Sequence, residues 1–120
     1  MPKQRVTTVF KSLEYCRKQG GYVAKVEHWN PHVKRRNDLF GFCDILWVTP
    51  DTIHHYVQST TQNGISSHIE KILTNDVACA LAKMPGVDIV LHAWARRVKK
   101  GRTRWDLRII RPFHKSPELE

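Results

Sequence analysis

Apolar residues recur at steps of three and four in two stretches of the chain, which is the pattern of a helix with one buried face. The first stretch predicts a helix over residues 7–18, which a threonine caps and two glycines end. The second predicts a helix over residues 67–84, which begins with the capping-box pattern Ser67-x-x-Glu70 and ends before a Pro-Gly pair. Both apolar stripes are interpreted as core packing.

Five further runs have the apolar character of β-strands, and turn-forming residues bound them. The short connection at residues 49–52 predicts that the second and third strands form an antiparallel hairpin. The predicted order is α-β-β-β-α-β-β, and an α/β domain with a mixed sheet flanked by the two helices is the simplest arrangement that buries both stripes. The runs cover residues 22–29, 42–48, 53–60, 88–98 and 103–111.

The chain of 120 residues has the length of one domain. We expect a single domain over residues 1–120, with its core at about 5–111 and a tail at 112–120. The three cysteines are an odd number and lie far apart, so neither a disulfide framework nor a cysteine zinc site is expected. No apolar run approaches the length of a membrane span and no apolar leader is apparent, which predicts a cytoplasmic protein without membrane contact.

Polar side chains interrupt two neighbouring predicted strands where apolar groups are usual. Asp44 comes near the start of one strand, and Gln58 and Thr60 share a face of the next because strand side chains alternate. Glu14, at the edge of the first helical stripe, is a possible second carboxylate. Oxygen ligands of this kind suit Mg²⁺ or Mn²⁺. The alternatives are a turn role for Asp44 and a solvated helix-edge position for Glu14.

Basic residues outnumber acidic ones by 20 to 11, which gives a formal net charge of +9 and an isoelectric point near 9.8. The excess is concentrated in residues 96–111, and a second basic run covers residues 34–36. Such a directed positive surface suits a polyanion, and the alternative is a solvated basic face. Beside a cation site it indicates phosphodiester hydrolysis. The candidate phosphate-binding residues are Lys34, Arg35, Arg36, Arg96, Arg97, Lys99, Lys100, Arg102 and Arg104.

The order of the polar residues resembles a known enzyme family. Glu14 on the first helix, Gly41-Phe42-Cys43-Asp44 at a strand start and Gln58-Ser59-Thr60 on the next strand occupy the places of the PD-(D/E)XK nuclease pattern. Within that superfamily, residues 5–111 are similar to Holliday-junction-resolvase-like members from phages and bacteria. The resemblance implies a restriction-endonuclease-like core, Mg²⁺ or Mn²⁺ as cofactor, and the cytoplasm of a bacterium or a phage-infected host cell.

The resemblance also implies a role for each matching residue. Asp44 would be the central metal ligand, Glu14 an outer ligand, and Gln58 the ligand in the place that is usually acidic. The backbone carbonyl of Ser59 would complete the set. Because Gln58 brings no charge, the expected affinity for a dication is lower than with a carboxylate.

Thr60 stands where the superfamily has a lysine that orients the attacking water or stabilises the transition state, and loss of that cation lowers the expected rate. Lys71, on the second helix, is the candidate for a lysine that has moved, and its alternative is a solvated helix side chain. Lys25 and Glu27 on the first strand are weaker candidates for a substitute lysine and a substitute acid.

Together these features predict a divalent-metal-dependent, structure-selective DNA endonuclease that acts on branched or duplex DNA. A monomer and a homodimer are both left open. The alternative from another class is a catalytically inactive nucleic-acid-binding module on the same fold, in which Gln58 and Thr60 mark a lost site. A third alternative is a basic protein-interaction domain.

Overall fold

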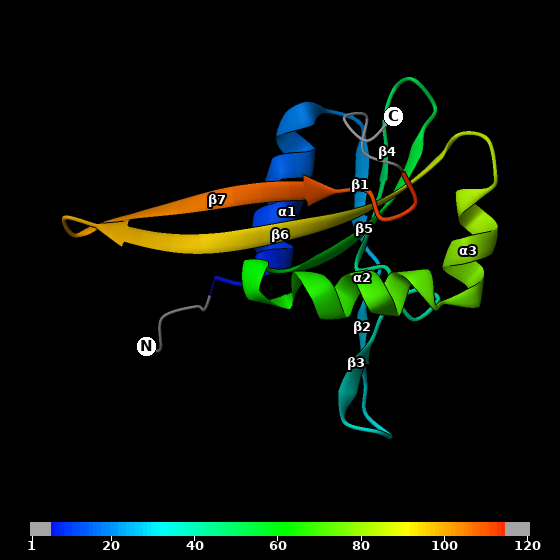
Figure 1. The fold of residues 1–120 in the computed structure, drawn as a ribbon, viewed down its shortest axis with the longest axis horizontal. Coiled ribbons are helices and arrows are strands. Elements are labelled where there is room, and N and C mark those ends of the chain that lie inside the picture. Colours follow the sequence, from blue (N-terminus) through cyan, green and yellow to red (C-terminus); the bar gives the residue numbers. More distant parts are fainter. Residues whose placement is uncertain (1–5, 115–120) are drawn as a thin grey trace.

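The computed structural model describes residues 6–114, with the side chains of Arg35 and Arg36 outside the described part. A five-stranded sheet is covered by helices on both faces, and a two-stranded sheet extends from one end (Figure 1). None of the helices within residues 6–114 combines the length and apolar character that a membrane crossing requires. The elements are α1 (Thr8–Gln19), β1 (Tyr22–Lys25), β2 (His28–Asn30), β3 (Arg35–Asn37), β4 (Ile45–Val48), β5 (His54–Thr61), a 3-10 turn (Gln62–Gly64), α2 (Ile65–Leu73), α3 (Asp76–Ala82), β6 (Val87–Lys99) and β7 (Arg102–Ile110).

The five-stranded sheet has the order β1-β4-β5-β6-β7. β5 and β6 are parallel, with Gln58 beside Leu91, and the other neighbouring pairs are antiparallel. The 3-10 turn, α2 and α3 form the long crossover that two parallel strands require. The α/β class, the mixed sheet and the hairpin between β4 and β5 are therefore confirmed. Of the predicted tail, residues 115–120 lie outside the described part.

Each face of the sheet carries its own core cluster. We call the face that α1 covers the α1 face, and the face that α2 and α3 cover the α2 face. Because strand side chains alternate, Val57 and Ser59 of β5 point to the α1 face, whereas Gln58 and Thr60 point to the α2 face. Apolar side chains on each face pack against the helix that covers it, and their burial supplies the main driving force for seating the helices on the sheet. The α1 face buries Leu13, Ile45, Val57 and Val90. The α2 face buries Phe42, Cys43, Ile72, Ala78, Ile89 and Leu91.

A buried polar cluster joins α1 to the sheet. Ser12 Oγ lies 2.9 Å from Ser59 Oγ and 3.0 Å from His92 Nδ1. Trp94 Nε1 donates a hydrogen bond to the same Ser12 oxygen over 2.8 Å. Burial lowers the pKa of His92 to about 4, so its imidazole is neutral at pH 7. Buried polar groups left without partners cost about 1–3 kcal/mol each, so this cluster specifies how α1 is seated on β5 and β6.

The prediction of one continuous helix over residues 67–84 is wrong, because α2 and α3 are separated by a break at Asn75. The Asn75 side chain caps α3 by accepting a hydrogen bond from the Ala78 N–H, and its amide donates to the Phe40 carbonyl, each over 2.9 Å. α2 also starts before the predicted capping box, and Ser67 instead donates to the Gly64 carbonyl. The apolar stripe conceals the break because both helices pack on the same cluster.

The predicted strand over residues 22–29 is in fact two strands in different sheets. β1 ends at Lys25, and β2 pairs with β3, which forms within the segment predicted as a basic loop. The strand predicted from residue 42 begins at Ile45 as β4. The first helix and the three remaining strands agree with the prediction to within one residue at each end.

Candidate functional site

Three carboxylates from separate segments meet on the α2 face, and we call Glu27, Asp38 and Asp44 the acidic cluster. One carboxylate oxygen from each residue lies within 4.8 Å of the others. Asp44 is 3% exposed, whereas Glu27 and Asp38 are partly exposed. The cluster is therefore closed on the side of Asp44 and open to solvent beside the other two residues.

A tight turn places Asp38 next to Asp44. Leu39 and Cys43 pair as an antiparallel bridge, so the residues just outside this bridge lie opposite each other. Gly41 within the turn has a φ of +81°, a conformation that glycine adopts without strain. The glycine and the bridge together explain why two acids six positions apart become neighbours.

Glu27 reaches Asp44 because β1 pairs with β4. The ladder continues one step past the last paired residues, since the Val26 N–H donates to the Asp44 carbonyl over 2.8 Å. On its other side, the Asp44 N–H donates to the Val57 carbonyl over 2.9 Å. Asp44 is thus fixed by backbone bonds on both sides, although it precedes β4.

The Asp44 carboxylate is held by β5. Its Oδ2 accepts hydrogen bonds from Gln58 Nε2 and from the Ser59 backbone N–H, each over 2.8 Å. Gln58 is 3% exposed, and its Oε1 accepts no hydrogen bond from the residues that the structure describes. Because an unpaired buried acceptor costs about 1–3 kcal/mol, a cation or a proton donor that reaches Gln58 Oε1 would stabilise this arrangement.

The acidic cluster disfavours its own negative charge. Burial, opposed by the Ser59 N–H and assisted by the neighbouring carboxylates of Asp38 and Glu27, raises the pKa of Asp44 to about 8. At pH 7 this shift favours the protonated form of Asp44. A divalent cation among the three carboxylates would displace this proton and offset their repulsion.

Lysines approach the acidic cluster from two elements. Lys71 of α2 places its Nζ 3.0 Å from Asp38 Oδ2. Lys25 at the end of β1 places its Nζ 3.6 Å from Glu27 Oε1. The structure therefore brings five sequence-selected residues close together, and their roles in a site stay a prediction: Asp44, Gln58, Lys71, Lys25 and Glu27.

Glu14 is not brought to the acidic cluster. It lies on α1, which covers the opposite face of the sheet, and its Oε1 pairs with Lys11 at 3.2 Å. The carboxylates that lie beside Asp44 are instead those of Glu27 and Asp38. Sequence reasoning missed Asp38 as a member of the acidic cluster, and the signal that could have found it is a second acid placed before the glycine turn that precedes Asp44.

Thr60 and Ser59 have roles in packing that their sequence positions did not indicate. A β-carbon on Gly64 would lie 2.6 Å from Thr60 Oγ1, so Gly64 permits the start of α2 to pack closely over Thr60. Ser59 gives its N–H to Asp44 and its hydroxyl to Ser12 on the other face. The Ser59 carbonyl as a metal ligand stays a prediction.

Six of the nine predicted phosphate-binding residues gather where β6 ends and β7 begins. β5 accompanies β6 only as far as Trp94, whereas β6 and β7 remain paired to Lys99 and Arg102. Residues 95–106, which we call the ribbon, therefore project beyond the sheet, at the left of Figure 1. Lys34 is exposed in the turn between β2 and β3, and the side chains of Arg35 and Arg36 lie outside the described part. The exposed ribbon cations are Arg96, Arg97, Lys99, Lys100, Arg102 and Arg104.

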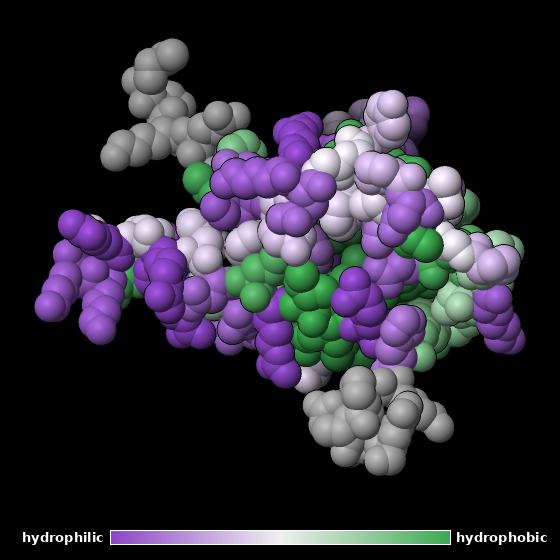
Figure 2. Space-filling view, turned by 90° about the horizontal axis from the view of Figure 1, so that it is seen from above, coloured by the Kyte–Doolittle hydropathy of each residue, from purple (hydrophilic) through white to green (hydrophobic). Residues whose placement is uncertain are grey.

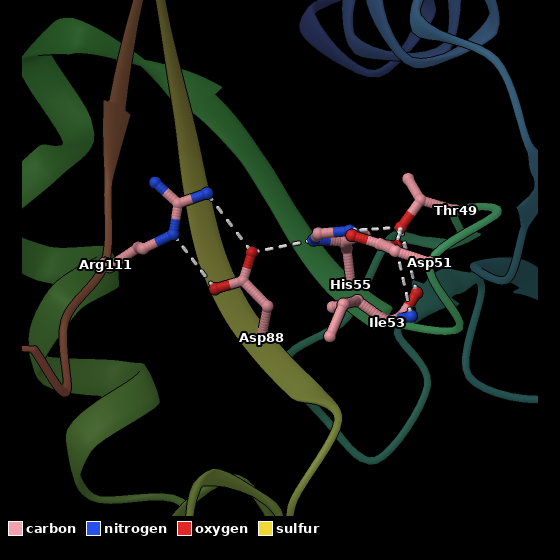
Figure 3. A network of polar contacts seen from close by, with 6 residues as sticks. All are labelled: Thr49, Asp51, Ile53, His55, Asp88 and Arg111. Carbon is pink, nitrogen blue, oxygen red and sulfur yellow. Dashed lines mark hydrogen bonds and ion pairs between the residues drawn. The ribbon is translucent and has the colours of Figure 1, made fainter.

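A separate polar network on the α1 face ties the hairpin of β4 and β5 to β6 and β7 (Figure 3). Asp88 binds Arg111 through both carboxylate oxygens, and its Oδ2 lies 2.7 Å from His55 Nδ1. Burial raises the pKa of Asp88, but hydrogen bonds from Arg111 and His55 outweigh burial and hold the pKa below its usual value. The hydroxyl oxygen Oγ1 of Thr49 lies 3.0 Å from His55 Nε2, and the same hydroxyl donates a hydrogen bond to Asp51. Because this hydroxyl is engaged with Asp51, we interpret the network as a structural tether.

Comparison of the chain with protein-family models, with curated protein sequences and with solved structures finds no match. The function is therefore argued from the acidic cluster and the ribbon.

Proposed function

We propose that the protein is a divalent-metal-dependent DNA endonuclease of the structure-selective, Holliday-junction-resolvase-like kind, with the acidic cluster as its metal centre. The observation that carries this proposal is the meeting of three carboxylates beside the buried amide of Gln58. The strand order β1-β4-β5-β6, with α1 and α2 on opposite faces, supports a restriction-endonuclease-like core.

The donor set fits a hard cation. Mg²⁺ and Mn²⁺ prefer oxygen ligands, usually one or two carboxylates with carbonyl oxygens and waters. The acidic cluster supplies the carboxylates, and Gln58 Oε1 is an amide oxygen with no partner among residues 6–114. When bound, the cation would polarise a phosphoryl oxygen of the substrate and lower the pKa of the attacking water.

Lys71 supplies a positive charge at the rim of the acidic cluster. Thr60 stands in the place of the superfamily lysine and is buried under the start of α2, so it brings no charge. Lys71 extends from α2 to Asp38, and its side chain is 41% exposed, so the ammonium group can also meet a phosphate. We assign to Lys71 the role of stabilising negative charge on the phosphate during cleavage.

A catalytically inactive nucleic-acid-binding module is the second candidate. The observation that favours it is the hydrogen bond from Gln58 Nε2 to Asp44, because this bond holds the carboxylate without a cation. In that case the ribbon would bind DNA and the acidic cluster would be a remnant.

The deciding experiment incubates the protein with a four-way junction and with a linear duplex of the same sequence, in Mg²⁺, Mn²⁺, Ca²⁺ or EDTA, and separates the strands on a denaturing gel. The proposal expects cleavage in Mg²⁺ or Mn²⁺, with faster cleavage of the junction, and none in EDTA. Salt-sensitive binding without cleavage in any metal would establish the inactive module. Absence of salt-sensitive binding would refute both candidates, because phosphate contacts release counterions.

Replacing Lys71 by Met is expected to lower the metal-dependent cleavage rate about a hundredfold, because one stabilising cation is lost while the length of the side chain is kept. The matched control is Lys83→Met, an exposed lysine just after α3, which should cleave at the wild-type rate. Lys71→Arg should restore part of the activity. Equal rates for the two methionine variants would remove Lys71 from the mechanism.

A further inference from the structure

The α2 face of the sheet continues along the ribbon. Gln58 lies beside Leu91, and every second residue of β6 beyond Leu91 has the same facing, as do their partners on β7. The acidic cluster and part of the ribbon charge therefore belong to one face of the molecule. The ribbon residues on this face are Ala95, Arg97, Lys99, Arg102, Arg104 and Asp106.

Like charges lie directly opposite each other on this face of the ribbon. Arg97 is paired with Arg104, and Asp106 bridges these two at 2.6 and 3.0 Å. Lys99 is paired with Arg102, and neither forms an ion pair with another residue in the part of the chain that the structure describes. Opposed like charges destabilise a strand pair. An anion that binds both side chains would remove this repulsion.

The ribbon is built to hold its shape. Lys100 and Gly101 form a two-residue turn, with φ values of 52° and 75°. Positive φ at both positions is the signature of the turn type whose twist matches paired strands. The strand pairing continues up to this turn, so the cations near the tip stand on a regular two-stranded support.

The dimensions and the surface of the ribbon fit one class of nucleic acid. Its free part is five residues long on each strand, which is about 17 Å at about 3.3 Å per residue. The major groove of B-form DNA is about 12 Å wide and admits a two-stranded ribbon, whereas that of A-form RNA is too narrow. Figure 2 shows the projecting arm at the left as strongly hydrophilic.

We propose that the ribbon enters the major groove of a B-form DNA duplex, with Lys99 and Arg102 on the phosphates that border the groove. This inference rests on the proposed function for its choice of nucleic acid as the partner, and it adds the duplex form and the groove. Because Lys99 and Arg102 share the face of the acidic cluster, a duplex held in this way extends toward that cluster.

The test measures equilibrium binding of fluorescent 20-base-pair duplexes in EDTA, so that no cleavage occurs. Lys99→Gln/Arg102→Gln is expected to weaken binding at least tenfold and to reduce the salt slope by about 1.8, which corresponds to two phosphate contacts. The control Arg17→Gln/Lys18→Gln carries the same charge change at the end of α1 and should bind like the wild type. A duplex with glucosylated hydroxymethylcytosines, which fill the major groove, should bind at least tenfold more weakly, whereas a minor-groove ligand should leave binding unchanged.

Equal affinity for the blocked and the open duplex would overturn the major-groove assignment, as would equal affinity for double-stranded RNA. Normal DNA binding by the ribbon variant, together with its self-association in analytical ultracentrifugation, would show instead that the charges protect an open sheet edge. Cleavage of an unmodified junction by the wild type is measured separately. If the Lys99→Gln/Arg102→Gln variant loses DNA binding but the wild type does not cleave the junction, the endonuclease proposal alone is refuted. If the wild type cleaves the junction but the variant binds DNA normally, the ribbon assignment alone is refuted.

Discussion

Replacing Asp44 by Asn is expected to lower metal-dependent DNA cleavage by at least about a hundredfold, because the cluster loses its central carboxylate. The substitution keeps the shape of the side chain. An introduced amide oxygen can still accept the hydrogen bond from the Ser59 N–H. The same oxygen can also accept the hydrogen bond from Gln58 Nε2, because both bonds end on Asp44 Oδ2 in the wild type. The variant should therefore fold and lose activity for a chemical reason.

Glu14→Gln is the matched control for this substitution. It also changes a carboxylate to an amide, but on α1, where Glu14 pairs with Lys11 on the other side of the sheet. Cleavage and Mn²⁺ binding by calorimetry should stay at the wild-type level in Glu14→Gln and fall in Asp44→Asn, while duplex binding in EDTA should persist in both. Loss of activity in Glu14→Gln with activity retained in Asp44→Asn would reverse the assignment of ligands.

The sequence predicted those features that depend on local pattern. Alternation placed Gln58 and Thr60 on one face, and the helical stripe set the limits of α1 to within one residue. The position of a residue in a helical stripe does not say which face of a sheet the helix will cover. For that reason Glu14 was expected beside Asp44, whereas it lies on the opposite face of the sheet. The break at Asn75 was also concealed, because a capping side chain can end a helix without interrupting its apolar stripe.

The acidic cluster itself depends on contacts between distant segments. Asp38 approaches Asp44 through the bridge between Leu39 and Cys43, and Glu27 approaches through the extended ladder of β1 and β4. Neither contact has a periodic signal in the sequence. The alternation of residues 22–29 even obscures the contact between Glu27 and Asp44. It predicts one continuous strand, whereas β1 ends at Lys25 and Glu27 lies between β1 and β2. Clusters of this kind follow from strand pairing, which sequence reasoning did not resolve here.

In EDTA the protein is expected to lose about 2 kcal/mol of its free energy of unfolding between pH 6.5 and pH 8, and Asp44→Asn is expected to lose none of it. Burial and the neighbouring carboxylates raise the pKa of Asp44 from 3.8 to about 8 in the folded state. Between these values the folded state binds more protons than the unfolded state, so stability falls as pH rises, by about 1.4 kcal/mol per pH unit.

His92 acts in the opposite direction over a lower range. Burial lowers its pKa from 6.5 to about 4, so between these values the unfolded state binds more protons and stability rises with pH. The two slopes offset each other below pH 6.5, and the decline caused by Asp44 remains between pH 6.5 and pH 8. Urea unfolding at half-unit steps of pH would resolve the decline, and Glu14→Gln should retain it. Saturating Mn²⁺ should reverse the decline in the wild type, because a cation bound to the folded state takes the place of the proton. A wild-type stability that is flat from pH 6.5 to 8 and unaffected by Mn²⁺ would show that the three carboxylates do not form a cation site.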